Sequence, residues 1–287
     1  GRDALGANTS ASNNTAVGYQ AGVAVTTGGN NTLMGTNSGD AITTGNNNVF
    51  VGLNAGGATD DGQYNVAVGE GTLASNCVAG NTAIGEVALR DCTGSNQTAI
   101  GQNAGLTATD GANNTFLGRD AGRTGSPGGA VTTQSHIVCI ADESITTANI
   151  QVDWTVASDQ RDKTDFTALD LGLDFVKALA PVTYKWDKRS KYGDKTADDY
   201  DLNDQTPDGT HKEDWLDIGF KAQEVETLEQ AAGYNKSNNT NLVSSHSGDG
   251  KQMGLQYSKF IPILVKAIQE QNALIEALTA RVAVLEG

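Results

Sequence analysis

A serine and a lysine five positions apart, Ser158 and Lys163, are the pair in this 287-residue chain whose types and spacing best suit chemistry. They bound the stretch Ser158-Asp159-Gln160-Arg161-Asp162-Lys163. A serine hydroxyl is a poor nucleophile until a base removes its proton, and a lysine amine can do this only when it is neutral. The same stretch also suits a helix N-terminus or turn with the serine as N-cap. Taken alone, these six residues favour the second interpretation.

Three longer motifs follow this stretch along the chain. Leu169 to Trp186 reads LDLGLDFVKALAPVTYKW, Gly219 to Val225 reads GFKAQEV, and Leu255 to Glu270 reads LQYSKFIPILVKAIQE. The four segments in this order resemble the endosialidase-type C-terminal intramolecular chaperones. That family ends phage tailspikes and tail fibres, and it also occurs in a eukaryotic membrane-bound transcription factor. Phe260 stands where the family usually has leucine, a minor departure.

The resemblance implies that the chain cuts itself once, in cis, at the Ala157–Ser158 peptide bond. Ser158 would be the nucleophile and Lys163 the general base, as in a self-processing serine peptidase with a Ser–Lys dyad. Attack on the preceding carbonyl would be an N-to-O acyl shift that leaves an ester for water; direct attack by water is the open alternative. Arg161 could favour the neutral lysine, whereas the carboxylates of Asp159 and Asp162 would oppose it if they lay close.

Two polar residues of the GFKAQEV motif, Gln223 and Glu224, are further candidates. They could support the cleavage site, or they could simply hold the fold, and we favour the structural role. His211 and His246 lie in polar stretches that predict solvated loops. We expect no metal and no cofactor, because the three cysteines lack the paired spacing of a zinc site and are better suited to buried, reduced positions.

The elements that position this site begin with a repeat in which glycine recurs every 16 or 17 residues. The glycines are Gly1, Gly18, Gly35, Gly52, Gly69, Gly85, Gly101 and Gly118. Asn or Gln stands four positions before seven of them, and an aliphatic residue or Met stands just before each of those seven. This periodicity predicts stacked coils, each with one short strand, joined by a ladder of amide side chains. The acidic residues fall mostly in the linkers between strands, which argues against a glycosidase site.

The repeat resembles those of bacteriophage tail fibres and, more loosely, those in the heads of trimeric autotransporter adhesins. This resemblance implies a homotrimer. The coils also carry only about two apolar residues each, which favours several chains packing together.

The chain after the repeat predicts a junction and then a mixed domain. Short strands are expected at 136–140 and 150–154. The polar residues 187–216 are expected to form a surface loop or tentacle. In the chaperones that the chain resembles, extended segments embrace the client fibre, which makes 187–216 and 233–250 candidates for this role. From Ser258 two apolar rows repeat every seven residues, which predicts a coiled coil over about 258–286. The rows are Ile261, Ile268, Ile275 and Val282, and Leu264, Gln271, Leu278 and Leu285. Ile in one row and Leu in the other favours a dimer, whereas the family implies a trimer.

These patterns give a mixed fold: a repetitive all-β fibre over 1–122, expected to be a trimeric β-helix or β-roll, its end and junction over 123–157, and an α+β chaperone and autoprotease over 158–287. The net charge of −15 argues against binding a nucleic-acid backbone, and no signal peptide or membrane span is apparent. We therefore expect a phage tail-fibre segment that folds in the host cytoplasm and ends in the virion. Its partners would be its own copies, its own fibre as chaperone client, and a polysaccharide or protein receptor on the bacterial surface. The alternative is a non-cleaving structural or receptor-binding fibre with a C-terminal trimerisation domain.

Overall fold

The chain divides into two compact units in the computed structural model, which describes residues 1–195, 197, 199–235, 237 and 242–286. The first unit contains residues 1–146, 188–208 and 247–252. The second contains residues 147–187, 209–246 and 253–287. Some residues of the expected extended segments 187–216 and 233–250 therefore lie outside the described part of the chain.

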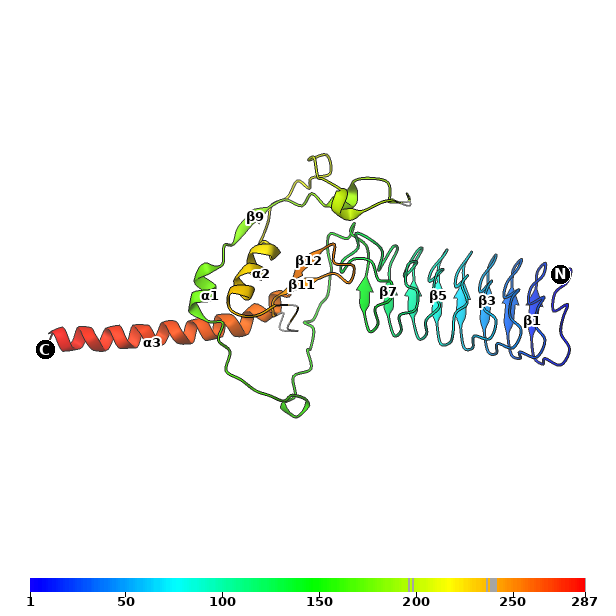
Figure 1. Cartoon of the computed structure of the whole chain (residues 1–287), viewed down its shortest axis with the longest axis horizontal. Helices are drawn as coiled ribbons and strands as arrows, with labels where there is room; N and C mark the ends of the chain where they lie inside the picture. The colour runs from blue at the N-terminus through cyan, green and yellow to red at the C-terminus, as the bar shows by residue number, and fades with distance from the viewer. Residues whose placement is uncertain (196, 198, 236, 238–241, 287) are drawn as a thin grey trace. The chain divides into compact units, whose positions relative to one another are not determined.

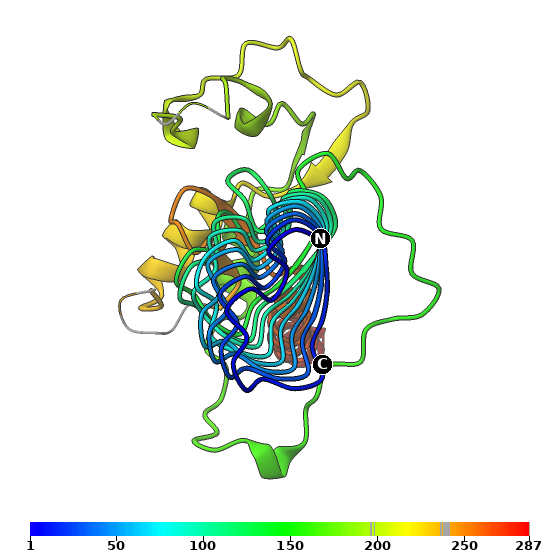
Figure 2. The same cartoon turned by 90° about the vertical axis from the view of Figure 1, so that its right-hand side faces the viewer.

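The first unit is built on a parallel β-solenoid with one short strand per coil (Figure 1). Its strands are β1 (Thr15–Val17), β2 (Thr32–Met34), β3 (Val49–Val51), β4 (Val66–Val68), β5 (Thr82–Ile84), β6 (Thr98–Ile100), β7 (Thr115–Leu117) and β8 (Val138–Ile140). Each strand pairs in register with the next, so equivalent residues of successive repeats lie above one another. A view along the stack shows the coils superposed (Figure 2). The predicted repetitive β architecture is confirmed, including a strand within 136–140.

The repeating glycine lets successive coils approach closely just after each strand. Gly35 has a φ of +139°, and a Cβ added to it would lie 2.3 Å from the carbonyl oxygen of Gly52 in the next coil. No other residue fits there without moving the backbone. The glycine spacing that marks the repeat in sequence is therefore set by the distance between stacked coils.

Buried amide side chains form the predicted ladder along the solenoid. The backbone N–H of Asn48 donates to Asn31 Oδ1 at 2.9 Å, and Asn48 Nδ2 donates to the carbonyl of Gly62 at 2.8 Å. The same positions are fully or almost fully buried in the neighbouring coils, and Gln97 takes the place of asparagine in one of them. Each amide thus satisfies backbone groups of adjacent coils that would otherwise be buried without partners.

Replacing Asn65 with leucine tests this ladder. The change removes the acceptor for the Asn81 backbone N–H, at 2.9 Å, and the donor to the Val78 carbonyl, at 3.3 Å. Because each buried polar group left without a hydrogen-bond partner costs about 1–3 kcal/mol, the free energy of unfolding should fall by about 2–4 kcal/mol. Urea denaturation measures this, with Gln63→Leu, an exposed amide in the same coil, as the control expected to change little. An equal effect of both changes would show that the ladder adds nothing specific.

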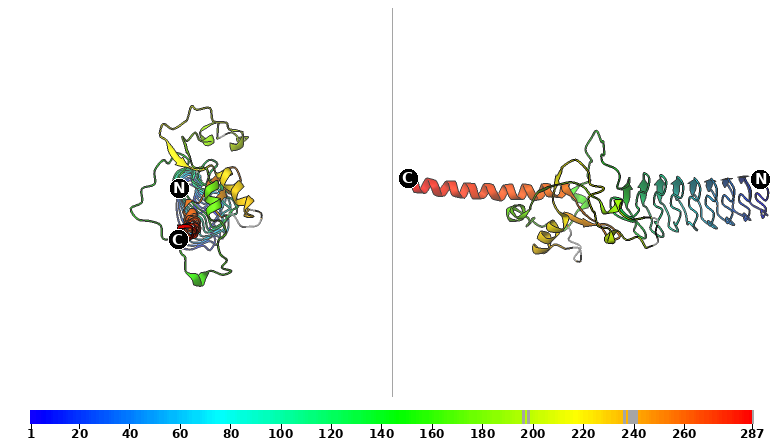
Figure 3. Two further views of the ribbon diagram at one scale, coloured as in Figure 1. Left: turned by 90° about the vertical axis from the view of Figure 1, so that its left-hand side faces the viewer. Right: turned by 90° about the horizontal axis from the view of Figure 1, so that it is seen from above.

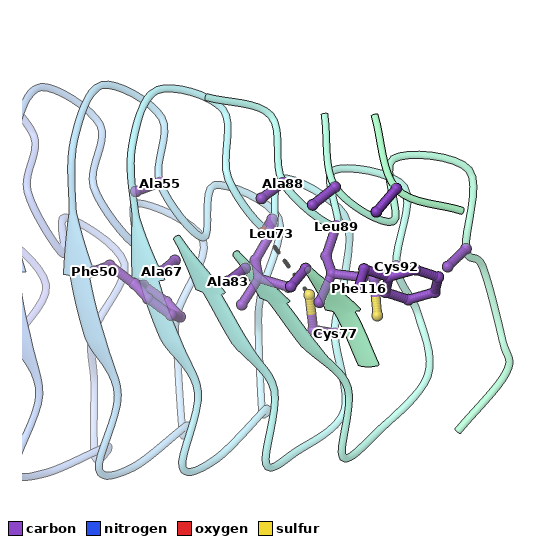
Figure 4. Packing of buried hydrophobic residues seen from close by; sticks show 14 of the residues in the cluster. Phe50, Ala55, Ala67, Leu73, Cys77, Ala83, Ala88, Leu89, Cys92 and Phe116 are labelled. Atoms are coloured by element: carbon purple, nitrogen blue, oxygen red, sulfur yellow. Dashed lines mark hydrogen bonds between the residues drawn. The ribbon is translucent and has the colours of Figure 1, made fainter. Parts of the chain in front are cut away.

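The interior of the solenoid is filled by side chains that compensate for one another between coils (Figure 4). Phe50 occupies the centre of its strand, and a Cβ on Gly56 in the following turn would lie 2.2 Å from its ring. Where the strand centre is the small Ala67, the equivalent turn position holds Leu73, which is fully buried. Each of these coils therefore holds one large buried side chain, supplied by the strand in one coil and by the turn in the other. The filled volume stays similar, as close packing requires.

The three cysteines are free and buried inside the solenoid, as expected. A hydrogen bond to the Cys92 thiol, followed by burial, raises the pKa of Cys77 above its ordinary value. Gln97 Nε2 of the amide ladder lies 3.2 Å from Cys92 Sγ. These thiols therefore act as small core residues next to the ladder.

The strand expected at 150–154 is absent, and that prediction was wrong. Residues 150–154 form no strand, and the side chains of Ile150, Val152 and Trp154 are exposed. Their alternation satisfies the sequence pattern of a strand, but a strand also needs a neighbouring edge for its backbone hydrogen bonds. In the single chain the segment has no regular secondary structure.

The second unit is the predicted α+β domain with a long terminal helix. Its elements are α1 (Leu173–Ala178), β9 (Val182–Tyr184), β10 (Asp217–Gly219), α2 (Ala222–Ala231), β11 (Ser244–His246), β12 (Met253–Leu255) and α3 (Phe260–Glu286). Strands β9 and β10 pair antiparallel, as do β11 and β12. The core is small and combines Leu171 and Phe175 with Val225, Val243, Phe260 and Ile263.

A buried carboxylate joins α2 to the strand β11. Glu229 accepts hydrogen bonds from the backbone N–H groups of Val243, at 2.5 Å, and Ser244, at 3.1 Å, and also from the Ser244 hydroxyl. His246 belongs to the same strand, and its ring Nε2 lies 2.7 Å from Glu226 Oε1. The prediction of a solvated loop at His246 was therefore wrong, because the strand places this ring against α2.

Helix α3 presents two different faces. At its start Phe260, Ile263 and Ala267 are buried in the core of the second unit. The apolar residues of the two seven-residue rows are instead between 44% and 84% exposed. Figure 3 shows α3 as one continuous helix. Of the helices that the structure describes, none has the length and apolar character needed to cross a membrane.

Candidate cleavage site

A short 3-10 helix, η1 (Gln160–Asp162), brings the predicted serine and lysine together. The backbone N–H of Lys163 donates to the Gln160 carbonyl at 3.2 Å, which turns the chain back on itself. Lys163 Nζ then lies 2.6 Å from Ser158 Oγ and 3.4 Å from the Ser158 carbonyl oxygen. A spacing of five residues therefore suffices for direct contact between hydroxyl and amine.

Asp159, and not Ser158, caps this helix. The Asp159 side chain accepts a hydrogen bond from the Arg161 backbone N–H at 2.9 Å. The alternative role of the serine as an N-cap is thus taken by its neighbour. The Ser158 hydroxyl remains available to Lys163.

The charges around the pair are arranged so that Arg161 and Asp159 neutralise each other. Their side chains form an ion pair at 2.6 Å. The Arg161 guanidinium lowers the pKa of Asp159 below its usual range, and Asp159 in turn raises the pKa of Arg161. Because Arg161 is paired with Asp159, the carboxylate offsets the positive charge by which the guanidinium could favour a neutral Lys163.

The candidate supporting residues Gln223 and Glu224 do not join this site. Both are exposed on α2, where the Gln223 carbonyl accepts from Thr227 Oγ1 at 2.8 Å and Glu224 pairs with Lys221 at 2.6 Å. Glu224 also borders a shallow groove of about 270 Å³ between the end of α1 and the start of α2. In the single chain, their contacts are made within α2 and with Lys221 just before it.

The bond before Ser158 lies in an exposed stretch. Residues 153–159 have no regular secondary structure, and Val156 is 78% exposed. Ser158 and Lys163 are exposed as well. In the single chain, the bond before Ser158 and the serine–lysine pair are therefore both accessible to solvent or to a neighbouring molecule.

Contacts within the second unit that join distant parts of the chain left no signal in the sequence. The Glu229 clamp and the Glu226–His246 pair join residues 14 to 20 positions apart across different elements. Their polar types fit exposed loops equally well. A buried carboxylate is recognised only once the strand that it holds has been placed.

Comparison with known families identifies the C-terminal region. A family model described as chaperone of endosialidase matches residues 158–234, so the match starts at Ser158. No curated protein and no solved structure matches the chain. The chain therefore carries an endosialidase-type chaperone domain that follows its β-solenoid in sequence.

Proposed function

We propose that the chaperone domain directs three copies of the chain to trimerise and fold, and then cuts each chain between Ala157 and Ser158. The contact of 2.6 Å between Lys163 Nζ and Ser158 Oγ carries this proposal. The lysine amine, which can accept a proton when it is neutral, is within reach of the hydroxyl of the first residue that the family model matches. Both side chains come from the segment that resembles the family's cleavage motif.

The reaction follows from this geometry. Lys163, in its neutral form, takes the proton of the Ser158 hydroxyl as Oγ attacks the carbonyl carbon of Ala157. The C–N bond before Ser158 breaks, its nitrogen receives a proton from the lysine, and an ester joins Ala157 to Ser158 Oγ. Water then hydrolyses the ester, leaving a carboxylate on Ala157 and restoring the serine hydroxyl. No cofactor is consumed.

Assembly supplies what the single chain lacks. Burial and nearby cations favour a neutral lysine, yet both members of the pair are exposed in one chain. We infer that neighbouring copies cover the pair in the trimer and so make cleavage depend on assembly. The exposed apolar rows of α3 provide a seam through which the copies associate as a coiled coil.

Trimerisation through the C-terminal domain would also help the solenoid to fold. A parallel solenoid pairs strands across many residues, and such non-local pairing nucleates slowly. Joining three chains first raises their effective concentration and sets their register. Cleavage then breaks the covalent link between fibre and chaperone, so an unfolded fibre could not be assembled again, and the fibre is left kinetically stable.

The setting that fits this scheme is a phage tail fibre that folds in the host cytoplasm and is incorporated into the virion. There the solenoid would form the shaft or a host-adhesion surface for a bacterial polysaccharide or protein. A non-cleaving fibre with a C-terminal trimerisation domain is the second candidate, favoured by the exposure of Ser158 and Lys163.

Intact mass measurement of the purified wild-type protein separates these candidates. Cleavage yields pieces of 157 and 130 residues, the second beginning at Ser158. An assembled trimer that retains only the full-length chain would support the non-cleaving fibre. Cleavage at another bond would contradict the assignment of Ser158.

A further inference from the structure

Segments on opposite sides of the proposed cut belong to the same compact unit. Residues 188–208 and 247–252 follow Ser158 in sequence, yet they form one unit with the solenoid, residues 1–146. Once the bond before Ser158 is broken, only non-covalent contacts would hold these segments to the fibre. Those contacts decide whether the released domain leaves.

The first set of contacts forms on an insertion in the last coil. Strands β7 and β8 start 23 residues apart, at Thr115 and Val138, instead of the usual 16 or 17. The insertion gives the docking loop, residues 123–131. Asp249 Oδ2 accepts from the Ala130 backbone N–H at 3.0 Å, and the Gly248 N–H donates to the Gly128 carbonyl at 3.3 Å.

The docking loop is also in tight van der Waals contact with both segments. A Cβ added to Gly125 would lie 2.6 Å from Ser190 Cβ, and one added to Gly129 would lie 2.7 Å from Ser247 Cβ. Ser190 and Ser247 are buried. Glycines at these points in the loop therefore allow the chaperone segments to approach the backbone of the fibre.

The second set of contacts is a group of three lysines, the lysine clasp, formed by Lys188, Lys191 and Lys195. Lys188 Nζ donates to the Glu143 carbonyl at 2.9 Å, and Lys191 Nζ donates to Ser144 Oγ at 2.8 Å. Lys195 forms an ion pair with the Glu143 carboxylate, whose side chain is only 11% exposed, against 32% for Lys195. Because about a third of the Lys195 side chain is exposed, salt can screen this pair, and the nearly buried Glu143 carboxylate is costly to leave without its cation.

The two chaperone segments are joined to each other independently of the fibre. Arg189 Nη2 donates to the Lys251 carbonyl at 2.6 Å, and Lys251 Nζ pairs with Asp201 at 2.9 Å. The lysine clasp and the residues that contact the docking loop therefore form one body. This body touches the fibre at 125–130 and at 143–144, on either side of β8 in sequence.

We propose that the cleaved chaperone domain stays bound to the end of the fibre through the lysine clasp and the docking loop, and that salt releases it. This rests on the proposed cleavage. None of the contacts above involves residues 147–158, so breaking the bond before Ser158 removes none of them. In a trimer three such attachments act together, which slows separation further. The partner of this surface is the end of the solenoid, namely the glycine-rich docking loop and the turn that holds Glu143.

The test follows the two pieces after cleavage by size-exclusion chromatography. In about 50 mM NaCl they should elute together, and in about 1 M NaCl, where the Debye length is about 3 Å, they should separate. Lys195→Met should lower the salt concentration needed and speed separation about tenfold, because it leaves the Glu143 carboxylate without its cation. Lys185→Met, at an exposed lysine of the second unit, is the matched control and should elute as the wild type does.

A second version of the experiment does not depend on self-cleavage. In a Ser158→Ala chain, a recognition site for a specific protease replaces residues 150–156 and is cut after assembly. Pieces that separate in low salt, or that stay together equally in high salt and in Lys195→Met, would overturn the clasp. A wild-type chain that never cuts itself while these pieces co-elute would instead contradict the proposed cleavage and leave the clasp standing.

Discussion

Replacing Ser158 with alanine is expected to give a single uncut chain of 287 residues where the wild type gives two pieces. The change removes the oxygen that we propose attacks the Ala157 carbonyl, and nothing else within hydrogen-bonding distance of Lys163 Nζ in this stretch is a hydroxyl. Ser158 is exposed, so its loss should not disturb folding. A denaturing gel of the assembled protein measures the result, and circular dichroism confirms that the fold is kept.

Substitution of Lys163 separates its role as a base from its charge. Lys163→Arg keeps the positive charge but cannot give up a proton near neutral pH, so cleavage should slow by about 10² to 10⁴-fold. Ser258→Ala, at another exposed serine, serves as the control and should be cut normally. Rapid cleavage of Lys163→Arg would mean that another group, or water alone, activates the serine.

The second large effect is expected from a charge in the seam of α3. Ile275 is 52% exposed in the single chain and belongs to the row that we assign to the coiled coil. An aspartate there would be buried in the trimer without a partner, which costs several kcal/mol per chain. Ile275→Asp should therefore elute as a monomer and should remain uncut, because neighbouring copies no longer cover Ser158 and Lys163. Light scattering and a denaturing gel measure the two consequences.

Ala280→Asp supplies the matched control on the opposite side of the helix. Ala280 lies five positions after Ile275, outside both seven-residue rows, and is exposed. This variant should assemble and cleave as the wild type does. A monomeric Ile275→Asp protein that is still cut at the wild-type rate would show that cleavage does not need assembly. A trimeric Ile275→Asp protein would show that the copies associate elsewhere.

The solenoid could be predicted because its constraints repeat. Gly35 allows neighbouring coils to approach, and Asn48 pairs with buried backbone groups. Both requirements recur along the stack, so the same residue types return at a fixed spacing. The contact between Ser158 and Lys163 was also within reach, since only one turn of chain separates them. In both cases a few neighbouring residues determine the geometry.

The contacts that could not be predicted from the sequence depend on residues far apart in the chain. The alternation of Ile150, Val152 and Trp154 is typical of a strand, but whether one forms is decided by an available edge. The side chain of Glu229 looks like any surface carboxylate until Val243 and Ser244 are brought to it. The lysine clasp likewise joins Glu143 to a residue 52 positions away. Single polar residues carry no mark of such pairings.

The in-register stacking of the strands has a consequence for the length of the fibre. Since each repeat adds one strand to the parallel sheet, the shaft grows in steps of about 4.8 Å, the spacing of neighbouring strands. Loss or duplication of a whole repeat returns every amide and glycine to an equivalent position, whereas a fraction of a repeat puts all later coils out of phase. The length of the shaft is therefore set by the number of whole repeats. Recombination between repeats can change it while both ends of the fibre keep their sequences.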